Sequence, residues 1–270
     1  MTASPSRNAD SADQSLSREE LRDVIDLALW AGQLLLQYGA EAERVEQTLI
    51  YFGTGLGCQW LDVLVSPNVI LLTTSSGDEF RTKVRRVPSL GVDLTKVSAV
   101  NRLSRRVAAG ELDRATVRAE LERISSLKPH YNRWLVALMV GLACAAFSRL
   151  FGGDWPVFAV TWVASSVAMF TRQALARRDF NPLLVAIVTA FVAGLVASSA
   201  ALFDLSATPQ LALASSVLLL VPGVPLINAA EDLIKGHLVI GLVRGVFGVL
   251  VSLGIALGLL LAMRLTGAGL

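Results

Sequence analysis

The sequence predicts a polytopic α-helical membrane protein with five transmembrane helices, the fourth of them broken, and an N-terminal cytoplasmic α+β domain. Hydrophobic residues make up 53% of the 270 residues and charged residues only 17%, with a mean hydropathy of +0.56. This composition is too apolar for a disordered chain or an ordinary soluble enzyme. Residues 1–133 carry 17 basic and 17 acidic side chains, whereas residues 134–270 carry seven and five. The charge-poor half also contains apolar runs close to the roughly 20 residues that a helix needs to cross a bilayer.

These patterns divide the chain into a disordered tail (1–16), a cytoplasmic domain (17–130) and a membrane domain (131–270). The N-terminus shows no signal peptide, so we expect the domain of residues 17–130 in the cytoplasm. The net charge of +2 gives no reason to expect a nucleic-acid partner. Cys58 and Cys144 form neither a disulfide framework nor a metal motif, and we expect no metal and no cofactor.

The cytoplasmic domain is predicted to open with two helices joined by a glycine turn. Ser17 and Glu20 form a capping box, in which each side chain bonds the other's backbone N–H. Apolar residues at helical spacing follow, and Gly39 ends the helix. A second helix begins at about Ala40 and closes at Gly57.

Three strands and two more helices are predicted to complete this domain. The strand candidates alternate with period two between turn signals, and each helix is opened by an aspartate that can cap it. The strands cover 59–65, 68–74 and 79–87, and the helices cover 93–109 and 113–127. This order predicts an α+β domain with a small antiparallel sheet.

Arg81, Lys83 and Arg85 share one face of the third predicted strand. Two interpretations are open: a basic strip that attracts anionic metabolites to a pore entrance, or a solvated strand face that blunts a sheet edge. The domain contains no Ser/His/Asp set, P-loop or dinucleotide-binding glycine pattern, so we do not expect an enzyme.

Five apolar segments are predicted to cross the membrane, and basic residues orient them. The loop between the second and third segments carries Arg172, Arg177 and Arg178, whereas the preceding loop offers only Arg149. By the positive-inside rule the former loop is cytoplasmic, and an odd number of spans places the C-terminus outside. The segments are 134–151, 155–171, 183–203, the short 211–221 with its neighbours, and 238–263.

The fourth segment is broken at Pro222, Gly223 and Pro225. Prolines lack the N–H that a helix needs, and glycine tolerates unusual dihedral angles. Non-helical backbone at membrane depth survives only inside protein or beside a cavity. The amides of the restarting helix then point at that cavity and favour carboxylates, so we place all three residues in a substrate site.

The restarting helix carries a polar stripe of Asn228, Glu231, Asp232 and Lys235 at i, i+3, i+4 and i+7. One hypothesis makes Asn228 and Lys235 substrate contacts and makes Glu231 or Asp232 a proton-coupling carboxylate. The alternative is an interfacial amphipathic helix, in which Glu231 only pairs with Lys235. We expect His237 to be an interfacial residue.

Arg244 is the strongest single candidate for substrate binding. Counted from Leu238, it lies about 9 Å into the fifth span at 1.5 Å per residue. A charge at such depth is costly unless it is paired or reaches water, and a guanidinium grips a carboxylate with two hydrogen bonds. The alternative is that its side chain extends to the cytoplasmic interface.

Four blocks of the sequence resemble the bacterial threonine/serine exporter (ThrE) family. They are Gly39-Ala40-Glu41 through Glu46, Arg133–Leu138 with Gly141, the run ASSVLLLVPGVPLIN at 214–228, and Lys235-Gly236-His237 leading to Arg244. The resemblance covers nearly the whole chain after the tail and is strongest to two-component members that export succinate. It implies a cytoplasmic-membrane exporter of small carboxylates or hydroxy-amino acids, with a second, small multi-span membrane subunit as partner.

We therefore expect an inner-membrane exporter subunit for C4 dicarboxylates such as succinate, with the lipid bilayer and that small subunit as its partners. Threonine or serine is the alternative substrate, and a homo-oligomer is left open. A membrane-anchored sensor or regulator is the alternative from another class, because a sensor would need only an anchor and would leave Arg244 idle.

Overall fold

The computed structural model describes residues 16–77, 79–88, 91–127 and 131–267. The predicted tail, apart from its last residue, and the predicted domain boundary at 130 lie outside these residues. Contacts divide the chain into two compact units. The first unit contains Met1–Lys128 and Val224–Gly245, and the second contains Pro129–Gly223 and Val246–Leu270. The division between a cytoplasmic and a membrane domain stays a prediction.

The first unit follows the predicted order of two helices, three strands and two helices. Helix α1 begins with the predicted capping box, in which Glu20 N donates to Ser17 Oγ at 3.3 Å and Ser17 N to Glu20 Oε2 at 3.0 Å. Asp93 and Asp113 cap the last two helices as predicted. The elements are α1 (Arg18–Gln37), α2 (Ala42–Gly55), β1 (Trp60–Ser66), β2 (Val69–Ser76), β3 (Glu79–Arg86), α3 (Leu94–Ala108) and α4 (Arg114–Ser125).

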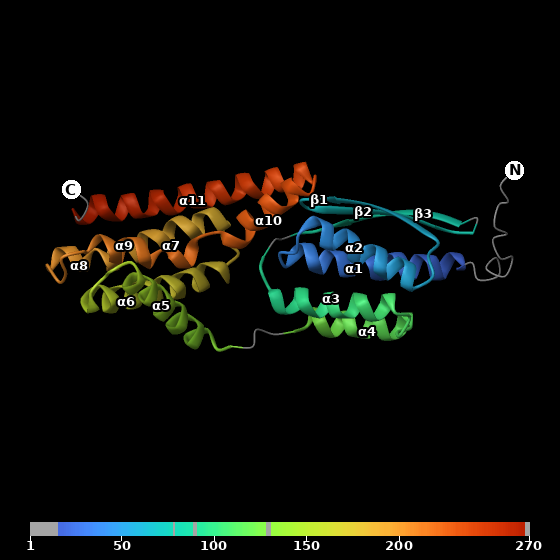
Figure 1. Cartoon of the computed structure of the whole chain (residues 1–270), viewed down its shortest axis with the longest axis horizontal. Helices are drawn as coiled ribbons and strands as arrows, with labels where there is room; N and C mark the ends of the chain where they lie inside the picture. The colour runs from blue at the N-terminus through green and yellow to red at the C-terminus, as the bar shows by residue number, and fades with distance from the viewer. Residues whose placement is uncertain (1–15, 78, 89–90, 128–130, 268–270) are drawn as a thin grey trace, which may run out of the picture. The chain divides into compact units, whose positions relative to one another are not determined.

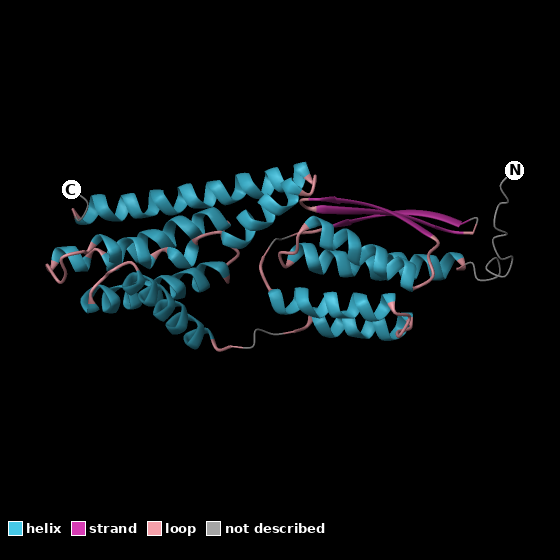
Figure 2. Ribbon diagram, viewed as in Figure 1, coloured by secondary structure: helices cyan, strands magenta, loops and turns pink. Residues whose placement is uncertain are grey.

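The strands form one antiparallel sheet in the order β1-β2-β3 (Figure 2). Its register places Leu64 opposite Leu71, and Leu71 opposite Val84. The sheet lies on one side of α1 and α2, and α3 and α4 lie on the other (Figure 1). Period two buries one face of β2, including Ile70 and Leu72, against the helices.

Two later elements complete the first unit. They are α10 (Gly223–Ile234), which belongs to it from Val224 onward, and the first residues of α11 (Leu238–Thr266). Gly236, at a φ of +88°, reverses the chain between them. Ile240 of α11 joins the same hydrophobic core as α1 and α2, so the start of α11 packs with the N-terminal elements.

The second unit is a set of helices packed through small residues. A Cβ on Gly141 of α5 would lie 2.1 Å from Ser166 Oγ of α6, and one on Gly258 of α11 would lie 2.4 Å from the Ile187 carbonyl of α7. Such close approach is typical of helices that associate in membranes. The elements are α5 (Arg133–Leu150), α6 (Trp155–Ala176), α7 (Pro182–Ala197), α8 (Ser199–Leu202), α9 (Gln210–Ser216), the 3₁₀ turn η2 (Leu218–Leu220) and the rest of α11.

Among the described residues, three stretches of helix are long and apolar enough to cross a membrane: Arg133–Leu150, Pro182–Leu202 and Leu238–Thr266. A fourth is the bent pair Gln210–Leu220 and Gly223–Ile234, if both helices make one span. The break predicted in the fourth segment is therefore present. The 22-residue α6 is not among these candidates, and the count of five spans stays a prediction.

Candidate functional site

The turn between α1 and α2 leaves backbone groups that need partners. Gly39 takes a φ of +92° at the end of α1, and Ala40 N donates to Leu35 O at 3.0 Å. Glu41 is the N-cap of α2, but its side chain makes no capping hydrogen bond. The carbonyls of residues 39 and 40 and the first amide of α2 therefore lack partners within the two helices.

Three side chains from α10 and α11 supply these partners, and we call Asn228, Asp232 and Arg244 the turn clamp. Asn228 Nδ2 donates to Gly39 O at 2.7 Å, and Arg244 Nη2 donates to Ala40 O at 2.7 Å. Asp232 Oδ1 accepts from Ala42 N at 2.8 Å, so it caps α2 from 190 residues away.

Asp232 and Arg244 also bind each other directly. Arg244 Nη1 lies 2.6 Å from Asp232 Oδ2, and the two residues are 7% and 0% exposed, Arg244 being the first of these. A buried ion pair is tolerated when additional hydrogen bonds satisfy its remaining atoms, and here the α1–α2 turn provides them. Both predicted site residues are thus brought together, and both are engaged within the protein.

Lys235 lies at the centre of a second, more exposed group of charges. Its Nζ is 2.6 Å from Glu231, 2.6 Å from Glu43 and 3.5 Å from Glu41. Glu231 and Glu43 raise the pKa of Lys235 above its ordinary value. The i,i+4 pair of Glu231 and Lys235 that the sequence allows is therefore formed, and α2 adds two more carboxylates to it.

Glu41 is a buried member of this group that the sequence reasoning did not single out as a site residue. Burial raises the pKa of Glu41, and a hydrogen bond with Glu231 raises it further, while Arg44 at 3.2 Å opposes the shift. His237 Nδ1 lies 3.5 Å from Glu46 Oε1. The signal that could have found Glu41 is the first resemblance block, which includes it and which packs against the last.

Pro222, Gly223 and Pro225 form the break and the first turn of α10. Val221 takes extended angles (φ −55°, ψ 122°) before the break, and α10 begins at Gly223. A Cβ on Gly223 would meet no atom within 4 Å. These residues set the direction of the helix that carries Asn228 and Asp232.

The basic strip on β3 is turned toward α1. Lys83 Nζ bonds Asp26 Oδ1, and Arg85 Nε donates to Gln33 Oε1 at 2.6 Å. These contacts occupy Lys83 and Arg85 within the first unit. Arg81, the third member of the strip, has a buried Nε without a hydrogen-bond partner among the described residues, so the choice between the two interpretations of this strand stays open.

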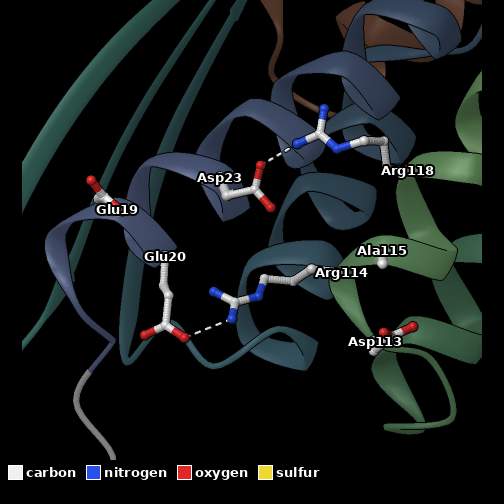
Figure 3. A pocket seen from close by; sticks show the side chains of 7 residues that line it. All are labelled: Glu19, Glu20, Asp23, Asp113, Arg114, Ala115 and Arg118. Atoms are coloured by element: carbon white, nitrogen blue, oxygen red, sulfur yellow. Dashed lines mark hydrogen bonds and ion pairs between the residues drawn. The ribbon is translucent and has the colours of Figure 1, made fainter.

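A groove between α1 and α4 is lined largely by charged residues (Figure 3). Arg114 pairs with Glu20 at 2.6 Å, and Arg118 pairs with Asp23. The lining also contains two further carboxylates, so negative charge is in excess and the groove suits no dicarboxylate anion. Its residues are Glu19, Glu20, Asp23, Asp113, Arg114, Ala115 and Arg118.

Comparisons with known proteins agree with the resemblance found in the sequence. The sequence model of the family described as "Putative threonine/serine exporter" matches residues 26–266. The chain is 40% identical to the "Probable succinate transporter subunit YjjP" of Klebsiella aerogenes, over 95% of this chain and 97% of that protein. It is 38% identical to the Escherichia coli K12 protein of the same name, over 93% and 98%.

A more distant relative is the "Threonine/serine exporter" of Corynebacterium glutamicum. It is 26% identical over 92% of this chain, but the match covers only 52% of that longer protein. No solved structure shows a significant match.

Proposed function

The chain belongs to the threonine/serine exporter family, and from this membership we propose that it is the larger subunit of a two-component exporter of small carboxylates. The proposed substrates are succinate and related C4 dicarboxylates. The observation that carries this proposal is the 40% identity, nearly end to end, with a protein named as a succinate transporter subunit.

The proposed partner is a second, small multi-span membrane subunit, YjjB-like. Two observations support it. The relatives that match nearly end to end are named as subunits, and the threonine/serine exporter of Corynebacterium glutamicum has about as much chain again beyond the matched part. The proposed location is the bacterial inner membrane, crossed several times, with the N-terminus in the cytoplasm and the C-terminus outside.

Arg244 and Asn228 of the turn clamp, together with Lys235, are the proposed substrate contacts. A C4 dicarboxylate carries two negative charges, which need compensation in a low-dielectric environment. Arg244 and Lys235 supply two cations, now held by Asp232 and Glu231. We propose that the substrate carboxylates replace these two side chains as partners, so that substrate binding opens the clamp.

Protonation of Glu231 or Asp232 is the proposed coupling step. A protonated carboxyl group releases its cation, so an inward-moving proton and an outward-moving anion would use the same pairs in turn. Asn228 is the proposed neutral contact. Pro222, Gly223 and Pro225 are proposed to direct the first amides of α10 toward the substrate.

Efflux of labelled succinate tests this proposal. Cells that produce the chain with its small partner are loaded with the label, and Arg244→Ala and Lys235→Ala variants are compared with Arg264→Ala, a cation in the last turn of α11. We expect the first two to lose most efflux and the third to retain it. Unchanged efflux at normal protein levels would remove Arg244 and Lys235 from the mechanism, and no succinate efflux from the unaltered pair would overturn the exporter assignment.

Serine or threonine is the second candidate substrate, favoured by the description of the family. An amino acid would need a cation for its carboxylate and a carboxylate for its amine. Efflux of labelled threonine and of labelled succinate is compared in the same cells, each with the other compound present unlabelled. The better substrate suppresses efflux of the other.

A further inference from the structure

The outer face of the sheet in the first unit is apolar, and the described residues leave it open. Helices α1 and α2 lie against the other face (Figure 1), where Ile70 and Leu72 join the core. An antiparallel sheet with one face in water normally carries polar side chains on that face. Here the large outward side chains are apolar and at least half exposed: Trp60 (50%), Leu64 (62%), Phe80 (65%) and Val84 (57%). An apolar patch of this kind marks an interaction surface.

The pairing register arranges this outer face in rows that cross the sheet from β1 through β2 to β3. In each of three successive rows, the residues on the two edge strands are of the same kind: aromatic in the first, polar in the second and aliphatic in the third. The rows are Trp60-Ser75-Phe80, Asp62-Thr73-Thr82 and Leu64-Leu71-Val84. The face is therefore nearly symmetric about the central strand β2.

We infer that this face binds the same face of a second copy of the chain, with a two-fold axis along β2. A two-fold interface uses one surface on both subunits, so that surface must complement itself. With the axis along β2, strand β1 of one copy lies over β3 of the other, and each row meets the same row. Trp60 then packs on Phe80 of the second copy, and Leu64 packs on Val84 of the second copy. The two sheets form a sandwich with the usual spacing of about 10 Å.

The polar row favours this axis over one that runs across the strands. An axis along β2 places Asp62 opposite Thr82 of the second copy. The side-chain oxygens of Thr73 and Thr82 lie 3.0 Å apart, and either can be the donor. If Thr73 donates to Thr82, the Thr82 hydroxyl keeps its own proton for the carboxylate of the second copy. An axis across the strands through this row would instead place Asp62 against Asp62 of the second copy, and like charges in an interface are costly.

The size of the patch indicates a reversible dimer. Strands about 4.8 Å apart and outward residues about 6.8 Å apart along each strand give three rows a footprint of roughly 300 Å². A standard stable interface buries about 800 Å² on each partner. We therefore expect copies that exchange, which allows two variants to be mixed in one experiment.

Crosslinking of the full chain at the axis tests the inference. Thr73 lies in the middle row of β2, so a cysteine there would face its counterpart in the second copy. Both natural cysteines are buried, which leaves an added surface cysteine as the reactive one. In membranes of producing cells, we expect a short dimaleimide to join Thr73→Cys chains into a covalent dimer at several times the yield of Ala119→Cys. Ala119 is exposed on α4, beyond α1 and α2 from the sheet. Equal yields would overturn the inference.

Other occupants of the face would give other products. A Thr73→Cys adduct with a different protein would assign the face to that protein. Labelling of Thr73→Cys by a lipid-soluble maleimide but not by a water-soluble one, without a covalent dimer, would assign the face to the bilayer. Either result would show the inference to be wrong.

Paired charge variants test the direction of the axis. With the axis along β2, Leu64→Glu with Val84→Glu places like charges opposite each other, and we expect about tenfold less covalent dimer through Thr73→Cys. Leu64→Lys with Val84→Lys should fail in the same way. When the glutamate and lysine chains are produced together, opposite charges meet, and the dimer should return as a mixed product. Both positions are exposed in the single chain, so each variant should melt near the temperature of the parent. If each variant dimerises alone as well as the parent, or if mixing restores nothing, the inference is refuted.

Discussion

Asp232 satisfies two groups at once, the first amide of α2 and the guanidinium of Arg244. Removing one partner of a buried ion pair leaves the other charge uncompensated, which costs about 3–5 kcal/mol. We therefore expect Asp232→Ala to lower the unfolding temperature strongly in a detergent-solubilised thermal melt. Glu231→Ala removes a partly exposed partner of Lys235 and should cost about 1 kcal/mol or less.

The double variant Asp232→Leu with Arg244→Met removes both charges of the ion pair, so that no buried charge is left uncompensated. Apolar replacement of both partners is often neutral or stabilising. The double variant should therefore regain much of the thermal stability that Asp232→Ala loses. If Asp232→Ala melts at the same temperature as Glu231→Ala, the turn clamp does not stabilise the first unit.

Glu46 on α2 gives a prediction for pH. Burial raises the pKa of Glu46 above its ordinary value of 4.5, Glu43 adds to the shift and His237 opposes it. A raised pKa means that the folded state holds the proton more tightly than the unfolded state. Ionised Glu46 therefore destabilises the fold once the pH rises through the folded pKa, and the penalty disappears below pH 4.5. The melting temperature of Glu46→Gln should exceed that of the parent at neutral pH, and the gap should close as the pH falls.

Glu120 gives the opposite prediction for the pH dependence of stability. Arg123 lowers the pKa of Glu120 through a hydrogen bond, so its ionised form stabilises the fold above the unfolded pKa and loses that effect in acid. Glu120→Gln should therefore be slightly less stable than the parent at neutral pH. Parallel pH profiles for the Glu46 and Glu120 variants would contradict one of the two assignments, and the direction of the change would show which.

The hairpin of α10 and α11 depends on close contact at one glycine. A Cβ on Gly241 would lie 2.8 Å from Leu233 Cγ and 3.0 Å from Ala229 O, whereas one on Gly245 would meet Ala229 Cβ at an ordinary 3.7 Å. Overpacking of this kind typically costs about 1–3 kcal/mol. We expect Gly241→Ala to lower both thermal stability and efflux, and Gly245→Ala to lower neither. Similar effects of the two would show that the hairpin is not tightly packed.

Local elements of this protein were predictable because their signals are local. The capping box of Ser17, the caps of Asp93 and Asp113 and the period-two strands each appear in the structure close to their predicted positions. The polar stripe on α10 was also visible. Periodicity identifies a face but not what it meets, so the contact of Asp232 with Ala42 could not be read from spacing.

The same limit applied to charges. The sequence showed Arg81, Lys83 and Arg85 on one strand face, but not that α1 would place Asp26 and Gln33 against it. It showed Arg244 inside an apolar run, and depth was counted from the first apolar residue. The start of that helix instead packs with the N-terminal elements, which hydropathy alone does not distinguish from a membrane span.

At the scale of the whole molecule, helix length bears on where the membrane begins. The 29 residues of α11 extend about 44 Å, which exceeds the roughly 30 Å of the hydrocarbon core. Residues 238–245 belong to the first unit and account for about 12 Å of that length. If the first unit lies outside the membrane, we expect Arg244 near the edge of the apolar core instead of deep within it.

This arrangement sharpens the topology prediction. If the first unit is cytoplasmic, α10 stays on that side, because Val224–Gly245 packs with it, and α11 leaves the cytoplasm to end outside. Alkaline phosphatase fused after residue 267 should be active, and a fluorescent protein fused there should be dark. Fusions at 178 should give the reverse. A bright C-terminal fluorescent fusion would mean an even number of spans.

Helix α11 is continuous from Leu238 to Thr266, and Gly245 lies within it. One alanine inserted after Gly245 would turn everything beyond it by about 100°, whereas seven, close to two full turns, would nearly restore the original facing. If export is lost with one added residue and partly restored with seven, the helix is rigid to twisting at Gly245. If neither insertion changes export, the helix is flexible at that point.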